Sequence, residues 1–196
     1  MTLVSEAFDR VKIVEGVRLL LEGIGDDPAR DGVAGTPERV ADMYAELFSG
    51  VGVDPQELLT VVAGAGHDEM IMVRDIPLYS MCEHHMVPFM GRAHVAYVPN
   101  RDGRITGLSK IARVVDLLSK RPQVQERLTT EIADALDAAL APRGVFVLIE
   151  AEHLCMTMRG VKKPGSITVT SAVRGVFRSD ARTRTEALEL VRRGRP

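Results

Sequence analysis

Hydrophobic residues near the start of the chain recur every three or four positions, which is the spacing of one buried helical face. The pattern predicts a helix over residues 5–22 and a second helix that begins at Thr36-Pro37 and stops at Gly50. Thr36 is expected to cap the second helix, and Pro37 suits a first turn, where its missing N–H costs nothing. A loop rich in Gly, Asp and Pro joins the two helices over residues 23–35.

From residue 70 onwards the pattern changes to alternating or fully apolar short runs, separated by two long amphipathic stretches. We expect strands over 70–79, 92–98, 145–151 and 167–173, and helices over 109–120, 123–140 and 183–193. Ser109 is expected to cap the first of these helices. The order strand, strand, helix, helix, strand, strand predicts an α+β domain, with an antiparallel four-stranded sheet and two helices on one face.

The change of pattern also divides the chain. Residues 1–65 are predicted to form a helical N-terminal segment, and residues 66–196 the α+β domain. A sheet of this kind keeps two open edges, and one way to manage such edges is to pair them with neighbouring subunits.

Composition excludes several classes of protein. Of the 196 residues, 45% are hydrophobic and 27% charged, as in ordinary globular chains. A net charge of -2, 4% aromatic residues and no Trp argue against a nucleic-acid binder. The longest strictly apolar run, Val145–Ile149, is far shorter than the roughly 20 residues of a membrane span. Because residues 1–10 also lack a secretory pattern, we expect a cytoplasmic protein that binds no membrane.

The two cysteines indicate metal binding more than a disulfide, because thiols stay reduced in the cytoplasm. Cys82 and His85 are one turn apart, and His153 and Cys155 share a face if their segment is extended. Cys82, His85 and Cys155 would leave the fourth position of a tetrahedral zinc site to water, which is the catalytic pattern. Zinc lowers the pKa of such a water to about 7.

Two further imidazoles would then remain beside the metal as proton carriers near neutral pH. Spacing alone does not decide which of His84, His85 and His153 bind metal and which act as acid or base. The alternative is that the cysteines are small core residues and the histidines are surface groups.

Basic and acidic residues near these motifs have two interpretations, an anion-binding pocket or ordinary surface charge. Lys110 and Arg113 share a helical face, and Arg159 follows the second cysteine, so an anion pocket competes with plain solvated charge. Gln125 and Glu126 open the second long helix; a carboxylate there can accept two N–H donors, or simply be a charge in a first helical turn. The phosphate loop Gly-x-x-x-x-Gly-Lys-Ser/Thr is absent.

Several motifs in register resemble the GTP cyclohydrolase I family, of the zinc-dependent bacterial type. They appear in the family's order between residues 25 and 178: Thr36–Val40, Cys82–His85, Gly107–Lys110, Arg121–Leu128, Glu152–Cys155 with Arg159-Gly160, and Ser166–Ser171. The departures, Asp31 and Val33 where the family pattern has Glu and Leu, lie outside the expected site.

The resemblance implies the tunnelling fold, in which subunits join their sheets into a barrel, and a decamer of two pentamers with active sites at subunit interfaces. It implies zinc held by Cys82, His85 and Cys155. The acid–base residues it implies are His84 and His153, with Ser109 on the ribose side. It assigns the guanine edge to Glu126 with Gln125, and the triphosphate to Arg39, Lys110, Arg113 and Arg159.

The implied reaction is hydrolysis of GTP to 7,8-dihydroneopterin triphosphate and formate, the first step of pterin and folate biosynthesis. His153 would protonate N7 of guanine, and zinc-activated water would attack C8, while the intact phosphates serve as handles. Two alternatives stay open: a scaffold in which zinc only joins Cys82 to Cys155, and a tunnelling-fold enzyme acting on another purine or pterin. Iron suits the same ligands as zinc.

Overall fold

The computed structural model of the chain describes residues 8–63 and 66–193. They belong to two compact units, which divide after Val53. None of the helices in the described residues combines the length and the apolar character that crossing a membrane requires.

The division lies earlier in the chain than the predicted boundary after residue 65. The reason is that the short helix η1 (Pro55–Leu58) and the strand β1 (Val61–Ala63) pack within the second unit. Leu58 lies against the hydrophobic core of that unit, and β1 pairs antiparallel with β4 (Arg104–Thr106). Three-residue strands carry too little periodicity to be recognised in the sequence.

The first unit contains the two helices that the apolar spacing predicts, α1 (Arg10–Gly23) and α2 (Thr36–Leu47). Residues 5–7 of the predicted first helix lie outside the described part of the chain. The two helices are joined by ion pairs such as Arg18 Nη2 to Glu38 Oε1, 3.1 Å apart. Such exposed pairs contribute about 0–1 kcal/mol each.

The predicted cap of α2 is wrong. Gly35 occupies the capping position without a side-chain hydrogen bond, and Thr36 is already the first helical residue. The Thr36 hydroxyl instead accepts a hydrogen bond from Arg39 Nη2 at 2.9 Å. The helix also ends at Leu47, before the predicted stop at Gly50.

The second unit is built on a sheet with the strand order β5-β2-β3-β6-β7. Its four long strands run antiparallel, as predicted: β2 (Ile71–Cys82), β3 (Pro88–Val98), β6 (Gly144–His153) and β7 (Ile167–Gly175). The two-residue strand β5 (Pro122–Gln123) adds a parallel pairing to the end of β2. The sheet is therefore mixed and five-stranded rather than four-stranded.

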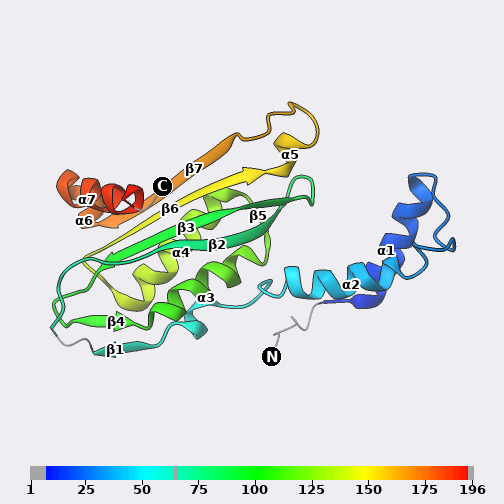
Figure 1. Cartoon of the computed structure of the whole chain (residues 1–196). Helices are drawn as coiled ribbons and strands as arrows, with labels where there is room; N and C mark the ends of the chain where they lie inside the picture. Colours follow the sequence, from blue (N-terminus) through cyan, green and yellow to red (C-terminus); the bar gives the residue numbers. More distant parts are fainter. Residues whose placement is uncertain (1–7, 64–65, 194–196) are drawn as a thin grey trace. The chain divides into compact units, whose positions relative to one another are not determined.

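Helices α3 (Leu108–Ser119) and α4 (Gln125–Leu140) cover one face of this sheet, as predicted (Figure 1). Fully buried side chains from both layers form the main core, among them Val95, Val114, Ile132, Leu136 and Val147. The predicted Ser109 cap is wrong, because Gly107 takes the capping position with extended φ and ψ angles of -63° and 136°. Ser109 is the second residue of α3.

The opposite face of the sheet is covered only in part. Helices α6 (Val176–Ser179) and α7 (Ala181–Arg192) enclose a second, smaller core around Phe146 and Phe177. Beyond that core, three apolar side chains of β3 and β7 stay 37–56% exposed: Met90, Ile167 and Val169. Among the described residues, nothing covers this part of the sheet.

Strand β7 forms one edge of the sheet and carries different residues on its two sides. Ile167 and Val169 belong to the uncovered face and are exposed. Thr168 and Thr170 face α4, where the Thr170 hydroxyl lies 2.6 Å from the hydroxyl of Thr129. The alternation is that of any strand, but here one side contacts a helix of the same chain and the other is free.

Candidate metal centre and active site

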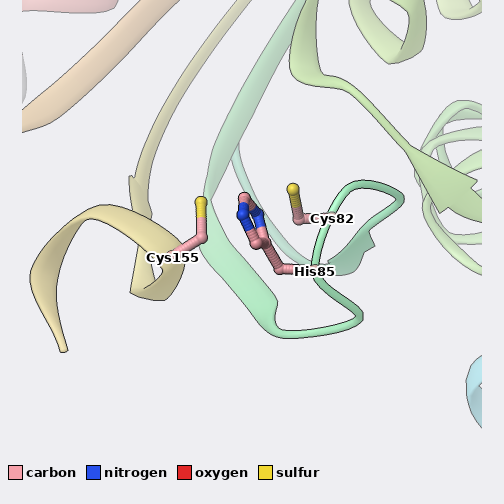
Figure 2. A group of neighbouring side chains, drawn as sticks. All are labelled: Cys82, His85 and Cys155. Atoms are coloured by element: carbon pink, nitrogen blue, oxygen red, sulfur yellow. The ribbon is translucent and has the colours of Figure 1, made fainter. Parts of the chain in front are cut away.

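Three predicted metal ligands from distant parts of the chain meet at one end of the sheet (Figure 2). Cys82 ends β2, His85 lies in the turn that follows, and Cys155 lies in the short helix α5 (Leu154–Thr157) after β6. Their ligand atoms lie within 4.8 Å of one another. Cys82 is buried, Cys155 is half-buried and His85 is exposed, so the cluster is reached from solvent on the histidine side.

A tight turn brings His85 back over Cys82. The Cys82 carbonyl accepts hydrogen bonds from His85 N at 3.3 Å and from Met86 N at 2.9 Å. Met86 has a φ of 53°, in the left-handed region that non-glycine residues rarely adopt. The backbone therefore reverses within a few residues, which fixes the separation of the thiol and the imidazole.

Cys155 reaches the cluster by a different geometry from the predicted one. The segment after His153 is not extended: β6 ends there and α5 begins at Leu154. The end of β6 still lies beside the turn that carries His85 (residues 83–87, the metal turn), because His153 pairs with Phe89 at the start of β3. Strand register, rather than a shared face of one strand, brings the second sulfur to the first.

The donor set fits zinc. Ligand atoms at about 2.3 Å for sulfur and 2.0 Å for nitrogen sit roughly 3.5–3.8 Å apart around a tetrahedral ion. Small rotations of Cys82, His85 and Cys155 would close their 4.8 Å cluster to those distances. Burial, and then the neighbouring Cys82, raise the pKa of the Cys155 thiol, whereas Arg159 lowers it. A bound cation would offset this penalty and hold both sulfurs as thiolates.

His153, one of the two predicted acid–base residues, is held by two neighbours. Its ring stacks on Phe89, with centroids 4.6 Å apart and planes inclined by 8°. Its Nε2 lies 2.7 Å from Oε1 of Gln125. Burial lowers the pKa of the imidazole, and the charge of Glu126 partly raises it again.

His84, the other predicted acid–base residue, is placed differently. Its side chain is 64% exposed, and its Nδ1 lies 4.0 Å from the Cys82 sulfur. Its other nitrogen, Nε2, is 4.0 Å from Oε1 of Glu83. Both predicted proton carriers therefore lie next to the metal cluster, one exposed and one half-buried.

The two residues predicted for the guanine edge have unequal surroundings. Glu126 is exposed in the first turn of α4, and its carboxylate acts on His153. The side chain of Gln125 is buried and its amide bonds to the protein itself, at the carbonyls of Ile149 and Thr168. Only Glu126 offers a free polar group to a ligand.

The predicted triphosphate residues do not all lie near the metal. Arg159 does: its Nη1 is 3.5 Å from the carbonyl oxygen of Cys155. Ser109, Lys110 and Arg113 lie near the start of α3, whereas its last residue, Ser119, accepts a hydrogen bond from Ser80 of β2 at 2.7 Å. The helix between the two ends is about 15 Å long. The start of α3 therefore lies at the opposite end of the helix from its contact with β2.

Arg39 belongs to the first compact unit. Its Nη2 donates to the carbonyl of Gly32 at 3.3 Å and to the hydroxyl of Thr36 at 2.9 Å. The guanidinium is exposed and keeps further N–H groups for a ligand.

Sequence reasoning missed an ion pair that holds the metal turn. Arg127 of α4 bonds to the carboxylate of Glu83, and donates to the Pro122 carbonyl at 2.9 Å and to Gln123 Oε1 at 2.9 Å. The Arg127 hydrogen bond lowers the pKa of Glu83, which keeps that carboxylate charged. The only signal was that both residues belong to matched motifs.

Phe89 was missed as well. An apolar residue at the start of a strand gives no sign that it stacks on a histidine, since the pairing of β3 with β6 decides that contact.

Comparison with known proteins agrees with the geometry. The family model described as GTP cyclohydrolase I matches residues 13–192. GTP cyclohydrolase 1 of Thermobifida fusca is 59% identical over 189 residues, covering 96% of this chain and 91% of the relative. GTP cyclohydrolase 1 of Pelotomaculum thermopropionicum is 60% identical over 185 residues, covering 94% and 98%. Among solved structures, the apo archaeosine synthase QueF-Like aligns with a TM-score of 0.45 and 18% identity, over 54% of this chain and 93% of its own.

The two full-length sequence matches and the family match extend across both compact units and include every predicted site residue. The α+β domain, with its long strands and two covering helices, is the tunnelling fold that the motifs imply. The chain therefore belongs to the GTP cyclohydrolase I family.

Proposed function

We propose that this GTP cyclohydrolase I carries out its reaction at Cys82, His85 and Cys155, with His84 and His153 as proton carriers. The reaction is the hydrolysis of GTP to 7,8-dihydroneopterin triphosphate and formate, at the start of folate biosynthesis. The observation that carries the proposal is the approach of two sulfurs and an imidazole nitrogen to within 4.8 Å, beside two further imidazoles.

Cys82, His85 and Cys155 would hold zinc, which when bound would supply activation of water near neutral pH. The protein's own groups do the rest. His153 gives a proton to N7 of guanine, which makes C8 electrophilic, and Glu126 holds the guanine edge at the start of α4. The exposed His84 carries protons while the five-membered ring opens, formate leaves and the ribose rearranges.

The triphosphate needs cations that stay bound to it throughout, because no phosphoryl group is transferred. Arg159 lies beside Cys155 and is placed to take part of this charge. Ser109, Lys110 and Arg113 would come from the first half of α3 in a second subunit, since roughly 9–15 Å of helix separates them from Ser119, the end of α3 that contacts β2. Arg39 would complete the phosphate site.

A homo-oligomer follows from this incomplete site, and a decamer of two pentamers is the assembly that we propose. Two features of the described residues support it. Strand β7 is an open edge, and the sheet face beside it leaves Ile167 and Val169 exposed at 56% and 55%. Neighbouring sheets that paired along such edges would close into a barrel and bury those side chains.

Incubation of the purified protein with GTP, with and without a chelator, tests the proposed function. We expect released formate, and a fluorescent pterin after oxidation, only when metal is present. Cys155→Ala should lose both zinc and turnover, whereas His153→Ala should keep zinc and lose at least about 100-fold in turnover. GTP that returns unchanged at full zinc occupancy would contradict the assignment of the site, and equal zinc loss in both variants would reassign the ligands.

A further inference from the structure

The side chain of Gln125 is 1% exposed, although it is the first residue of α4. Its Nε2 lies 3.1 Å from the Ile149 carbonyl, 3.0 Å from the Thr168 carbonyl and 3.0 Å from the Thr170 hydroxyl. A buried amide with this many partners inside the protein has no group left for a substrate. Its remaining atom, Oε1, faces His153 at 2.7 Å.

The orientation of this amide is fixed by its partners. The Thr129 hydroxyl donates its single hydrogen to the Gln125 main-chain carbonyl at 2.6 Å. The hydrogen bond of 2.6 Å between Thr129 and Thr170 must then be donated by Thr170. The Thr170 oxygen consequently accepts from Nε2 of Gln125. A flipped amide would instead set its oxygen against two main-chain carbonyl oxygens, neither of which can donate.

The state of His153 follows from that orientation. Oε1 of Gln125 can only accept, so Nε2 of His153 carries a hydrogen. In the neutral ring, Nδ1 is then the nitrogen without a hydrogen. The stacked ring of Phe89 fixes the plane of the imidazole, and the amide fixes its rotation within that plane.

We infer that Gln125 is a positioning residue for His153, and not a contact of the guanine edge. It holds the ring in one rotation, with Nε2–H directed at the amide oxygen, which leaves Nδ1 as the nitrogen that can meet the substrate. Thr129 and Thr170 fix the amide in turn. The inference rests on the proposed role of His153. It changes the role of Gln125 from a contact of the guanine to a residue that acts through His153.

The test compares Gln125→Met with the wild-type protein, both loaded with zinc. Methionine keeps the length of the side chain and removes the acceptor. We expect kcat to fall about 10–100-fold, as misplacement of a catalytic group does, while zinc content and the Kd for GTP change less than about threefold. A role at the guanine edge predicts the opposite split, with weaker GTP binding and a kcat largely kept. Either that split or a loss of zinc would overturn the inference.

A matched pair of threonine variants covers the case in which Gln125→Met does not fold. Thr170→Val removes one partner of the amide, and should lower kcat about 3–10-fold with GTP binding unchanged. Thr130→Val is the control, because its hydroxyl bonds to the Glu126 carbonyl on the same helix at 3.0 Å but lies outside the network. Equal kcat values in the two variants would contradict the inference. A wild-type protein that fails to convert GTP would instead sink the proposed function itself.

Discussion

Phe89 provides the flat apolar surface on which the His153 ring lies, 4.6 Å away and inclined by 8°. It is fully buried at the start of β3, opposite His153 in the strand register. The ring of the histidine is thus confined by one residue through its face and by Gln125 through its edge. Confinement of this kind matters because proton transfer needs the donor and the acceptor within hydrogen-bond distance.

Replacement of Phe89 by Leu should separate its two functions, which are to stack on the His153 ring and to fill the core. Leucine fills most of the buried volume but offers no flat face, so kcat should fall about 10-fold, since the ring loses its fixed plane. The free energy of unfolding should drop by only about 1–2 kcal/mol. Steady-state turnover and thermal unfolding measure the two effects. Val95→Ala, in the same strand but away from His153, should show the loss of stability without the loss of turnover.

The two cysteines of the metal cluster were predictable because the chain has only two thiols and thiolates suit zinc. The role of Gln125 was not predictable. It depends on which carbonyls of β6 and β7 lie beside the start of α4, and no local pattern contains that register. For the same reason the sequence left the choice among His84, His85 and His153 open.

Two ligands lie at the end of β2 and in the turn that follows it, and an ion pair joins this turn to α4. Arg127 bonds to Glu83 within the turn and also to Pro122 and Gln123 of β5. The edge strand β5 therefore works as a spacer between α4 and the metal turn. This arrangement makes the position of His85 depend on a helix that contributes no ligand.

Arg127→Met should weaken zinc binding about 10-fold, because partners that orient metal ligands typically contribute 10–100-fold to affinity. The ion pair is partly exposed, with the Arg127 side chain 43% accessible, so thermal stability should change little. Competition against a chromophoric chelator measures the affinity. Arg174→Met is the control. It breaks the ion pair between Arg174 of β7 and Asp134 of α4, which lies away from the metal turn. Equal affinities in both variants would show that the tie has no influence on the metal.

At the level of elements, periodicity located every long helix and strand of the described residues, and failed at the short ones. β1, β4, β5, η1 and the short helices α5 and α6 span only two to four residues each, too few for a period to show. The predicted caps failed because the chain places Gly35 and Gly107, not Thr36 and Ser109, just outside their helices. Each predicted cap is off by one or two residues, which is the precision with which a local pattern places a helix end.

At the scale of the whole molecule, the candidate site residues of one chain form two separate groups. The cluster and Arg159 lie at one end of the sheet, while Lys110 and its neighbours lie at the far end of α3. The proposed site uses both groups, so we expect it to form between copies of the chain. The sequence offers candidates for both halves, but the distance between the halves depends on the direction of α3 relative to β2, which no local pattern contains.

Co-expression of two inactive variants tests this division. His153→Ala and Lys110→Ala damage opposite halves of the site, so each should be inactive as a homo-oligomer. Random mixing should restore about a quarter of the wild-type rate, because one interface in four joins two intact halves. The mass of the mixed assembly and its turnover are the measurements. Mixed oligomers without any recovered turnover would mean that both residues serve a site within one chain.

Strand β7 takes part both in the proposed pairing of subunits and in the placement of His153. Its side chains Ile167 and Val169 are exposed at the edge where we propose that another sheet pairs. The Gln125 amide donates to the Thr168 main-chain carbonyl and to the Thr170 hydroxyl of the same strand. A neighbouring subunit that paired with this strand would therefore contact the same strand that holds the Gln125 amide beside His153. The contacts that hold the His153 ring are complete within one chain. Dilution that separates the subunits should therefore remove the neighbour's half of the pocket and leave the imidazole in its place.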